Sequence, residues 1–336
     1  THALKILSGK KANEIQANYS LNEAKAVVSV NADFMMSGRD SLRLSKEFAD
    51  ARRVNVKKGD QDALGKTDIN RLYSVEANFS VTGSNSDHRY RLAESATFEF
   101  MIALSKELSK HIKLDASITN FIEGFVSKYD FSKDALTTEK TGAEFIAAIA
   151  NDLAGLKKAG KNSAILVGDD QSSAIQILGL LLNDALGNQG KTITFSERAA
   201  KVSDHSIEEL STMIAESKIK DLLILGGNPA YDAPADLKFA EKTASINTIH
   251  LTSHFNETSI ASKIAIPKAH FLEYWGDTRS ADGTTNIIQP LIAPLFGAVS
   301  DAELLAKLIQ SKQTKGIELV KATYELEGAA WEKAVH

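Results

Sequence analysis

The second half of this sequence alternates short apolar runs with amphipathic stretches of helical length, and no other feature constrains the fold as strongly. The apolar runs have the length and composition of buried strands and span 164–167, 191–195, 221–225 and 247–251. Stretches with helical spacing lie between them at 172–186, 206–217 and 235–243. Strands that alternate with helices in this way predict an α/β fold with a mainly parallel sheet and helices on both faces.

The first half of the sequence predicts a similar unit. The run 26–30 has the β-branched composition of a strand buried on both faces, and a helical pattern follows at 40–53. A second strand is expected at 71–76, and helical patterns dominate from 93 to 156. Thr141 and Glu144 form a capping box that begins the last of these helices.

A weak internal echo relates the two halves. Residues 26–34 end a strand with Asn-Ala-Asp-Phe, and 221–229 end one with Gly-Gly-Asn-Pro. A length of 336 residues allows two lobes of doubly wound, mainly parallel sheet flanked by helices. The polar stretch 157–161 is expected to be the hinge between them. The expected domains are a first α/β lobe with a helical insertion at 1–157, a second, Rossmann-like lobe at 158–312, and a C-terminal segment at 313–336 that leads into further portions.

Composition excludes several classes of function. The chain has no cysteine, which rules out disulfides, thiolate zinc sites, cysteine nucleophiles and cysteine-ligated iron–sulfur clusters within it. A formal net charge of -4 with no basic stripe argues against nucleic acid as a partner. No apolar run reaches the roughly 18 residues that a membrane helix needs, the longest being 175–182. Any membrane association is therefore expected to come through partners.

The turn Gly226-Gly227-Asn228-Pro229 is the best candidate binding site, because it directly follows the strand 221–225. In open α/β sheets, ligands bind at the carboxyl ends of strands, where glycine lets backbone amides approach phosphate. The turn lacks both the three-glycine dinucleotide fingerprint and the lysine and hydroxyl of a P-loop. An ordinary tight turn is therefore favoured over an occupied nucleotide site.

Other polar groups have structural interpretations. In the turn 168–171, Asp169 and Asp170 are expected to cap the following helix, and paired acids there would repel a phosphate. Glu257 and Glu273 suit buried hydrogen-bonding roles better than acid–base catalysis, since no Gly-x-Ser-x-Gly elbow is present. Three histidines have a spacing that fits no zinc or copper site, so core or interface positions are favoured for His250, His254 and His270. Packing roles are expected for Trp275 and Trp331.

Short motifs along most of the chain follow the order of a known family. They are Ser29-Val-Asn-Ala-Asp-Phe34, Asn183-x-x-Leu-Gly-Asn188 with Gly190, Leu223-Ile-Leu-Gly-Gly-Asn-Pro229, Pro234-Ala-Asp236 with Phe239, Asn256-Glu257-Thr258, Ile266-Pro267 and Glu273-x-Trp-Gly-Asp277. This set resembles the molybdopterin oxidoreductase (DMSO reductase) family. A narrower set comprises Asn70-Arg-Leu-Tyr73, Ser80-Val-Thr-Gly83, Asp87-His-Arg89 and Gln289-Pro-Leu-Ile-Ala-Pro294. It resembles the molybdopterin-oxidoreductase-like portion of the iron–sulfur subunit of bacterial alternative complex III.

The resemblance implies a role in a respiratory complex that oxidises menaquinol or ubiquinol. In that iron–sulfur subunit the molybdopterin-like portion carries no molybdenum cofactor, and a separate ferredoxin-like portion carries the iron–sulfur clusters. The resemblance therefore implies a non-catalytic, cofactor-less scaffold on the periplasmic face of the bacterial inner membrane. The implied partners are the iron–sulfur portion, a multihaem cytochrome c subunit with c-type haems and integral membrane quinol-binding subunits, with a terminal oxidase as a further candidate.

The resemblance also names candidate residues. The loops that hold the guanine dinucleotide in catalytic relatives correspond to 226–229 and 277–283, which gives vestigial candidates Gly226, Gly227, Asn228, Pro229, Asp277 and Gly283. No catalytic or metal-binding residue is expected. The chain departs from a complete subunit because it lacks the cysteines of the cluster-bearing portion and the family's metal-ligand region.

Two alternatives to the scaffold stay open. The chain could be a fragment of an active molybdenum-bis(guanine dinucleotide) oxidoreductase whose other domains supply the metal ligand. An independent nucleotide-binding module ranks last. The sequence begins at Thr1 without methionine or signal peptide and ends within a helical pattern at 331–336. We therefore expect it to be part of a longer polypeptide.

Overall fold

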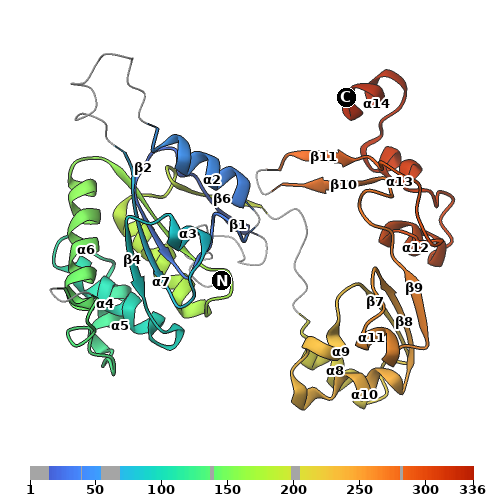
Figure 1. Ribbon diagram of the computed structural model, residues 1–336, viewed down its shortest axis with the longest axis horizontal. Coiled ribbons are helices and arrows are strands. Elements are labelled where there is room, and N and C mark those ends of the chain that lie inside the picture. Colours follow the sequence, from blue (N-terminus) through green and yellow to red (C-terminus); the bar gives the residue numbers. More distant parts are fainter. Residues whose placement is uncertain (1–14, 39, 54–68, 137–139, 198–204, 281–282) are drawn as a thin grey trace. The chain divides into compact units, whose positions relative to one another are not determined.

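The computed structural model describes residues 15–38, 40–53, 69–136, 140–197, 205–280 and 283–336, and the chain divides into two compact units (Figure 1). The first unit is Thr1–Lys201 and the second is Val202–His336. This division lies later than the hinge expected at 157–161. The reason is that the strand at 164–167, which we expected to open the second lobe, pairs with the strand at 26–30 and so belongs to the first unit.

The first unit is built on a four-stranded parallel sheet. Its order is β4-β3-β2-β5, with bounds β4 (His88–Arg91), β3 (Arg71–Glu76), β2 (Ala24–Val30) and β5 (Asn162–Val167). Val28 of β2 lies level with Tyr73 of β3 on one side and with Ile165 of β5 on the other. The chain moves from β2 to β3 and β4 in one direction and then returns to place β5 on the other side of β2. The strand order therefore reverses beside β2, which makes this the topological switch point.

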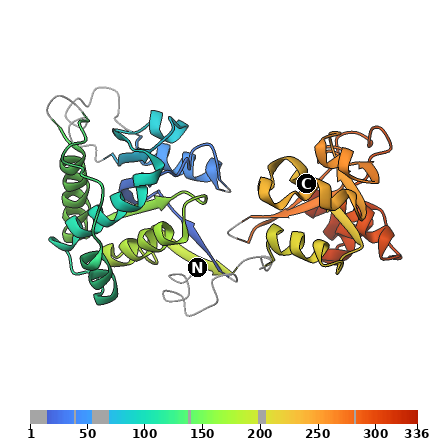
Figure 2. The same ribbon diagram turned by 90° about the horizontal axis from the view of Figure 1, so that it is seen from below.

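Helices cover both faces of the first sheet, which confirms the predicted doubly wound α/β class (Figures 1 and 2). One face carries Val28, Tyr73 and Ile165 and forms the larger core with helices α4 (Thr97–Ser109), α5 (Ala116–Gly124), α6 (Gly142–Lys158) and α7 (Ser173–Leu186). The other face carries Val27 and packs against Leu44 and Phe48 of α2 (Ser41–Asp50). Burial on both faces explains why these strands are continuous apolar runs.

Side chains close the outer edge of β5. Asn183 of α7 accepts a hydrogen bond from the Ile165 backbone N–H (3.0 Å) and donates one to the Ile165 carbonyl oxygen (2.7 Å). Asn188 accepts from the Ser163 N–H (3.2 Å), and the Thr192 hydroxyl donates to the Ser163 carbonyl oxygen (2.5 Å). The motif at 183–190 therefore satisfies backbone groups that would otherwise be an open sheet edge.

Smaller elements complete the first unit. They are the helix α3 (Val81–Ser84), the 3-10 turn η2 (Glu94–Ala96), and the strands β1 (Ile15–Tyr19) and β6 (Ile193–Glu197). The strand expected at 191–195 exists as β6, but it pairs antiparallel with β1 and lies outside the parallel sheet. Thr141 and Glu144 form the predicted capping box of α6. The N-cap of α7 is Ser172, whose side chain makes no capping hydrogen bond. The prediction that Asp169 and Asp170 cap this helix was therefore wrong.

The second unit contains a three-stranded parallel sheet of order β7-β8-β9. Its strands are β7 (Asp221–Leu225), β8 (Asn247–Thr252) and β9 (Ile264–Pro267). The accompanying helices are α8 (Ile207–Ala215), α9 (Pro229–Asp232), the 3-10 turn η3 (Ala235–Leu237), α10 (Phe239–Ala244) and α11 (Glu257–Ala261). As in the first unit, the first strand pairs in parallel with the second, so the internal echo seen in the sequence is present in the structure.

The C-terminal part of the second unit contains a hairpin and three helices. These are β10 (Gly276–Arg279), β11 (Thr285–Ile288), α12 (Asp301–Leu308), α13 (Gly316–Tyr324) and α14 (Gly328–Val335). Trp331 is buried with its ring 5.4 Å from that of Trp275, which confirms the packing role of both tryptophans. In the part of the chain that the structure describes, no helix has the length and apolar character needed to cross a membrane.

Candidate functional site

The sequence candidate Gly226–Pro229 lies at the carboxyl end of β7, as predicted. Gly226 and Gly227 have φ values of +80° and +75°, a left-handed conformation that favours glycine. The Gly226 N–H donates to the carbonyl oxygen of Leu251 in β8 (2.8 Å), which places the turn across the ends of both strands. The glycines are therefore required by the turn itself.

Asn228 connects this turn to α11. Its Oδ1 accepts hydrogen bonds from the Thr258 N–H (3.1 Å) and hydroxyl (2.8 Å), and its Nδ2 donates to Glu257 Oε2 (2.6 Å). The Asn228 amide holds the pKa of the Glu257 carboxyl below its usual range, so this carboxylate is charged at neutral pH. We expected both glutamates to be buried. Glu257 is instead exposed, and Glu273 is half-buried.

The other candidates, Asp277 and Gly283, lie in the β10–β11 hairpin. Asp277 Oδ2 accepts a hydrogen bond from the Tyr324 hydroxyl (2.6 Å), which ties the hairpin to α13. Gly283 has a φ of +92° and forms part of the hairpin turn. Among the described residues, no hydrogen bond joins these two residues to the Gly226–Pro229 turn. The structure therefore places the vestigial candidates at two separate structural elements.

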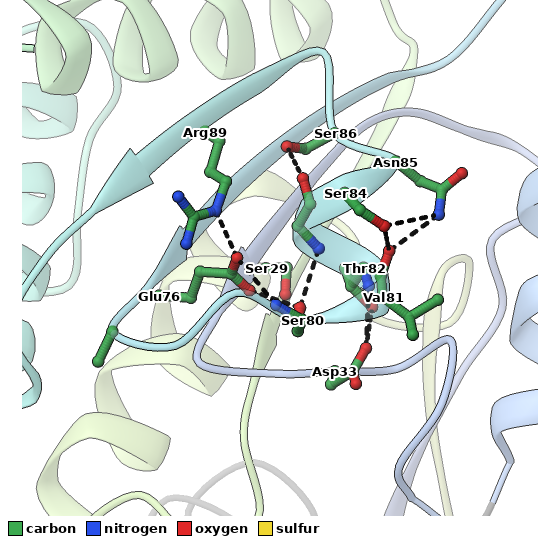
Figure 3. Close-up of polar contacts among 12 residues, drawn as sticks. Ser29, Asp33, Glu76, Ser80, Val81, Thr82, Ser84, Asn85, Ser86 and Arg89 are labelled. Atoms are coloured by element: carbon green, nitrogen blue, oxygen red, sulfur yellow. Dashed lines mark hydrogen bonds and ion pairs between the residues drawn. The ribbon is translucent and has the colours of Figure 1, made fainter.

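The sequence analysis missed a polar cluster at the carboxyl ends of β2 and β3, next to the switch point of the first sheet (Figure 3). After β2, Asp33 Oδ1 accepts from the Thr82 N–H (2.9 Å) and hydroxyl (2.8 Å). At the end of β3, the buried Glu76 accepts from Arg89 Nε (2.6 Å) and from the Ser80 hydroxyl (2.5 Å). The carboxylates at this edge are thus paired with donors from this chain. The available signal was Asn31 and Asp33 after the predicted strand 26–30, together with Glu76 as the last residue of the predicted strand 71–76.

The loops after β2 and β5 pack directly on each other. The Gly168 N–H donates to the carbonyl oxygen of Val30 (3.0 Å), and a Cβ added at Gly168 would lie 2.1 Å from the carbonyl oxygen of Asn31. Asn31 itself bridges to Thr97 and to the Ala77 N–H (2.9 and 3.1 Å). The backbones of these two loops are therefore in direct contact at the switch point, the place where an α/β sheet commonly binds its ligand.

The carboxyl end of β5 does not fit a diphosphate group of the kind a molybdopterin guanine dinucleotide carries, because Asp169 and Asp170 precede α7 where phosphate oxygens would bind. At the Gly226 turn the charge is mixed. Glu257 is charged there, and Lys268 Nζ, which pairs with Asp301 (2.6 Å), would lie 3.8 Å from a Cβ added at Gly226. The chain also offers no cysteine as a molybdenum ligand. Within the described residues, no three His, Asp or Glu side chains group so that they could hold a metal ion.

His250 is fully buried in β8 beneath the Gly226 turn. Its Nδ1 lies 3.0 Å from the Ser259 hydroxyl of α11, and within the described part of the chain its Nε2 has no hydrogen-bond partner. Burial lowers the pKa of His250 from its ordinary value of 6.5, and the nearby backbone of Gly227 and Gly226 offsets part of this shift. His254 and His270 are both exposed, so only one of the three histidines is in the core.

The second unit is expected to lose stability as the pH falls below 6.5. Unfolded His250 binds a proton more readily than the folded residue in this pH range, so the unfolding free energy falls by at most about 1.4 kcal/mol per pH unit. Urea unfolding from pH 7.5 to 5.5, followed by tryptophan fluorescence, measures this because both tryptophans lie in the second unit. His250→Gln should flatten the slope, and His254→Gln should leave it unchanged. If the His250→Gln variant kept the same dependence of the unfolding free energy on pH, that dependence would come from other groups.

Comparisons with known proteins show the fold alone. No protein-family model matches the chain, and no curated protein matches it in sequence. The chain is similar in structure to acetylene hydratase from Pelobacter acetylenicus, with a TM-score of 0.61 and 13% identity over 99% of this chain and 55% of that chain. A formyltransferase/hydrolase complex from Methylorubrum extorquens reaches a TM-score of only 0.39 at 12% identity, over 87% of this chain and 75% of that one, and supports no argument. The chain thus spans about half the length of acetylene hydratase.

Proposed function

We propose that this chain is a non-catalytic, cofactor-less scaffold in a quinol-oxidising respiratory complex of the alternative complex III type. The observation that carries the proposal is the contact at the switch point of the first sheet, where the backbone of Gly168 packs so closely on the carbonyl group of Asn31 that not even a Cβ atom fits between them. A fold can keep its rigid surface while the function found in similar folds changes, because function depends on the site and not on the fold.

Further observations support this proposal. The fold is similar to that of acetylene hydratase. Independently of this likeness, the sequence motifs resemble the molybdopterin oxidoreductase family. The negative charge of Asp169 and Asp170, directly before α7, opposes binding of a diphosphate at the carboxyl end of β5. The scaffold's contribution to electron transfer would be positional. It would hold the iron–sulfur portion against a multihaem cytochrome c subunit, beside integral quinol-binding subunits at the periplasmic face of the inner membrane.

The proposal is tested on the native assembly, purified through a tag on this chain. We expect molybdenum and pterin far below one per chain, c-type haem in the reduced-minus-oxidised spectrum, iron–sulfur signals by electron paramagnetic resonance, and quinol-driven reduction of the haem. One molybdenum with pterin per chain would instead make this a fragment of an active molybdenum oxidoreductase. A preparation without any redox partner would contradict the respiratory role.

A further inference from the structure

The helices α10 and α11, which pack on β8, lie on the same face of the second sheet. The Thr248 hydroxyl donates to the Thr243 carbonyl oxygen at the end of α10 (2.8 Å), and His250 contacts Ser259 of α11. Thr248 and His250 are two residues apart in β8, so both side chains point to this face. The two connections of the sheet, β7 to β8 and β8 to β9, therefore place their helices together.

The opposite face of the second sheet carries six aliphatic side chains, next to a polar pair formed by Asp221 and Asn247 at the start of β7 and β8. Leu223, Ile249 and Ile264 lie level across the three strands, as do Leu225, Leu251 and Ile266. Leu251 alone among these six is fully buried, whereas Leu225 is 40% and Ile264 is 53% exposed. No charged side chain lies among them. In the first unit the equivalent face is covered by α4, α6 and α7 and contains the larger core.

The strand β7 has the sequence of an interior strand but lies at an edge. Residues 222–225 are four consecutive aliphatics, a pattern typical of parallel strands with neighbours on both sides, yet β7 pairs only with β8. In the first sheet the edge strand β5 is closed by Asn183 and Asn188. Over the described residues, no side chain donates to or accepts from the backbone of residues 222–225 in this way. The edge of β7 is thus open.

The first unit shows what completes such a sheet. There, β2 has β3 on one side and β5 on the other, and the helices α6 and α7 that flank β5 in the chain cover the apolar face. By the internal echo, β7 corresponds to β2, and the position of β5 has no counterpart. We propose that the second sheet binds a partner polypeptide that adds a strand parallel to β7 and lays an amphipathic helix over the aliphatic face.

The symmetry of a homodimer favours a different polypeptide over a second copy of this chain. A two-fold axis would pair β7 with its copy in antiparallel orientation and would bring a second aliphatic face with no spare helix. The partner's contacting segment is expected to be apolar and uncharged, to match the face.

The absence of cysteine allows a direct test with single-cysteine variants. Ile264→Cys places a thiol on the aliphatic face, and Glu241→Cys places one on exposed α10 as a control. In the isolated chain both thiols should react with a maleimide at similar rates. In the native assembly, the thiol of Ile264→Cys should react at least about ten-fold more slowly than in the isolated chain. The reaction rate of Glu241→Cys should be the same in both. A photoreactive maleimide at Ile264→Cys should cross-link to an apolar strand or helix of another polypeptide.

Each other outcome overturns the proposal. Protection of Ile264→Cys in the isolated monomer would mean that this chain covers its own face. Protection that rises with concentration, together with a doubled mass by light scattering, would assign the face to a second copy. Equal labelling in the assembly and in the isolated chain would mean that the face stays free. Ile264→Asp should release the partner while leaving the melting temperature of the isolated chain nearly unchanged, because Ile264 is half exposed there.

Discussion

Replacing Asn183 by leucine is expected to lower the unfolding free energy of the first unit by about 4 kcal/mol. The Asn183 amide makes four hydrogen bonds, two to the backbone of Ile165, one to the carbonyl oxygen of Gly179 and one from Asn188. Leucine removes all four and leaves the N–H and carbonyl oxygen of a buried strand without partners. Each such unsatisfied group costs about 1–3 kcal/mol.

The measurement is urea unfolding followed by circular dichroism. Asn151→Leu, on an exposed position of α6, serves as the matched control and should change the unfolding free energy by less than about 0.5 kcal/mol. Tryptophan fluorescence should be unaffected in both variants, because Trp275 and Trp331 lie in the second unit. Equal midpoints for Asn183→Leu and its control would show that the side-chain closure of β5 contributes nothing to stability.

Gly168→Ala is expected to destabilise the first unit by about 3 kcal/mol. The new Cβ would lie 2.1 Å from the carbonyl oxygen and 3.0 Å from the carbonyl carbon of Asn31, so a backbone and not a flexible side chain must move. Asn31 is held by its bonds to Thr97 and Ala77 and cannot retreat without breaking them. The loss would measure how tightly the switch point is closed.

The control for this prediction is Gly155→Ala in α6, where an added Cβ meets nothing within 4 Å. It should raise stability by about 0.5–1 kcal/mol, because alanine is the better helix former. Thermal unfolding of both variants side by side gives the comparison. If Gly168→Ala were as stable as the parent, the loops after β2 and β5 would have to be adaptable, and the argument for a closed crevice would fail.

Local patterns in the sequence predicted which segments are strands and helices, but not which strands are neighbours. The runs at 26–30, 71–76, 221–225 and 247–251 all became parallel strands, because burial on both faces leaves a local signature. Pairing of β5 with β2 depends on a crossover of more than a hundred residues, which no local pattern records. The partner of β6 could not be predicted either. It is β1 (Ile15–Tyr19), whose sequence contains no apolar run that would indicate a strand.

The candidate site was predicted only where it is local. Gly226–Pro229 was found because a glycine-rich turn directly follows a strand. The closed switch point was missed because Asn31, Glu76 and Gly168 come from distant parts of the chain and meet only through the sheet order. The burial expected for Glu257 was also wrong, since hydrogen-bonding capacity can be read from residue type but solvent exposure depends on the helix that carries it.

The contrast between the closed edge of β5 and the open edge of β7 has a consequence for biogenesis. The first unit covers both faces of its sheet and closes the edge of β5 with its own side chains, so we expect it to fold as it leaves the ribosome. The C-terminal half carries an aliphatic surface that is prone to aggregate until it is covered. Synthesis without the partner should therefore yield a soluble N-terminal half but a chaperone-dependent or insoluble full chain, and joint expression should relieve this dependence.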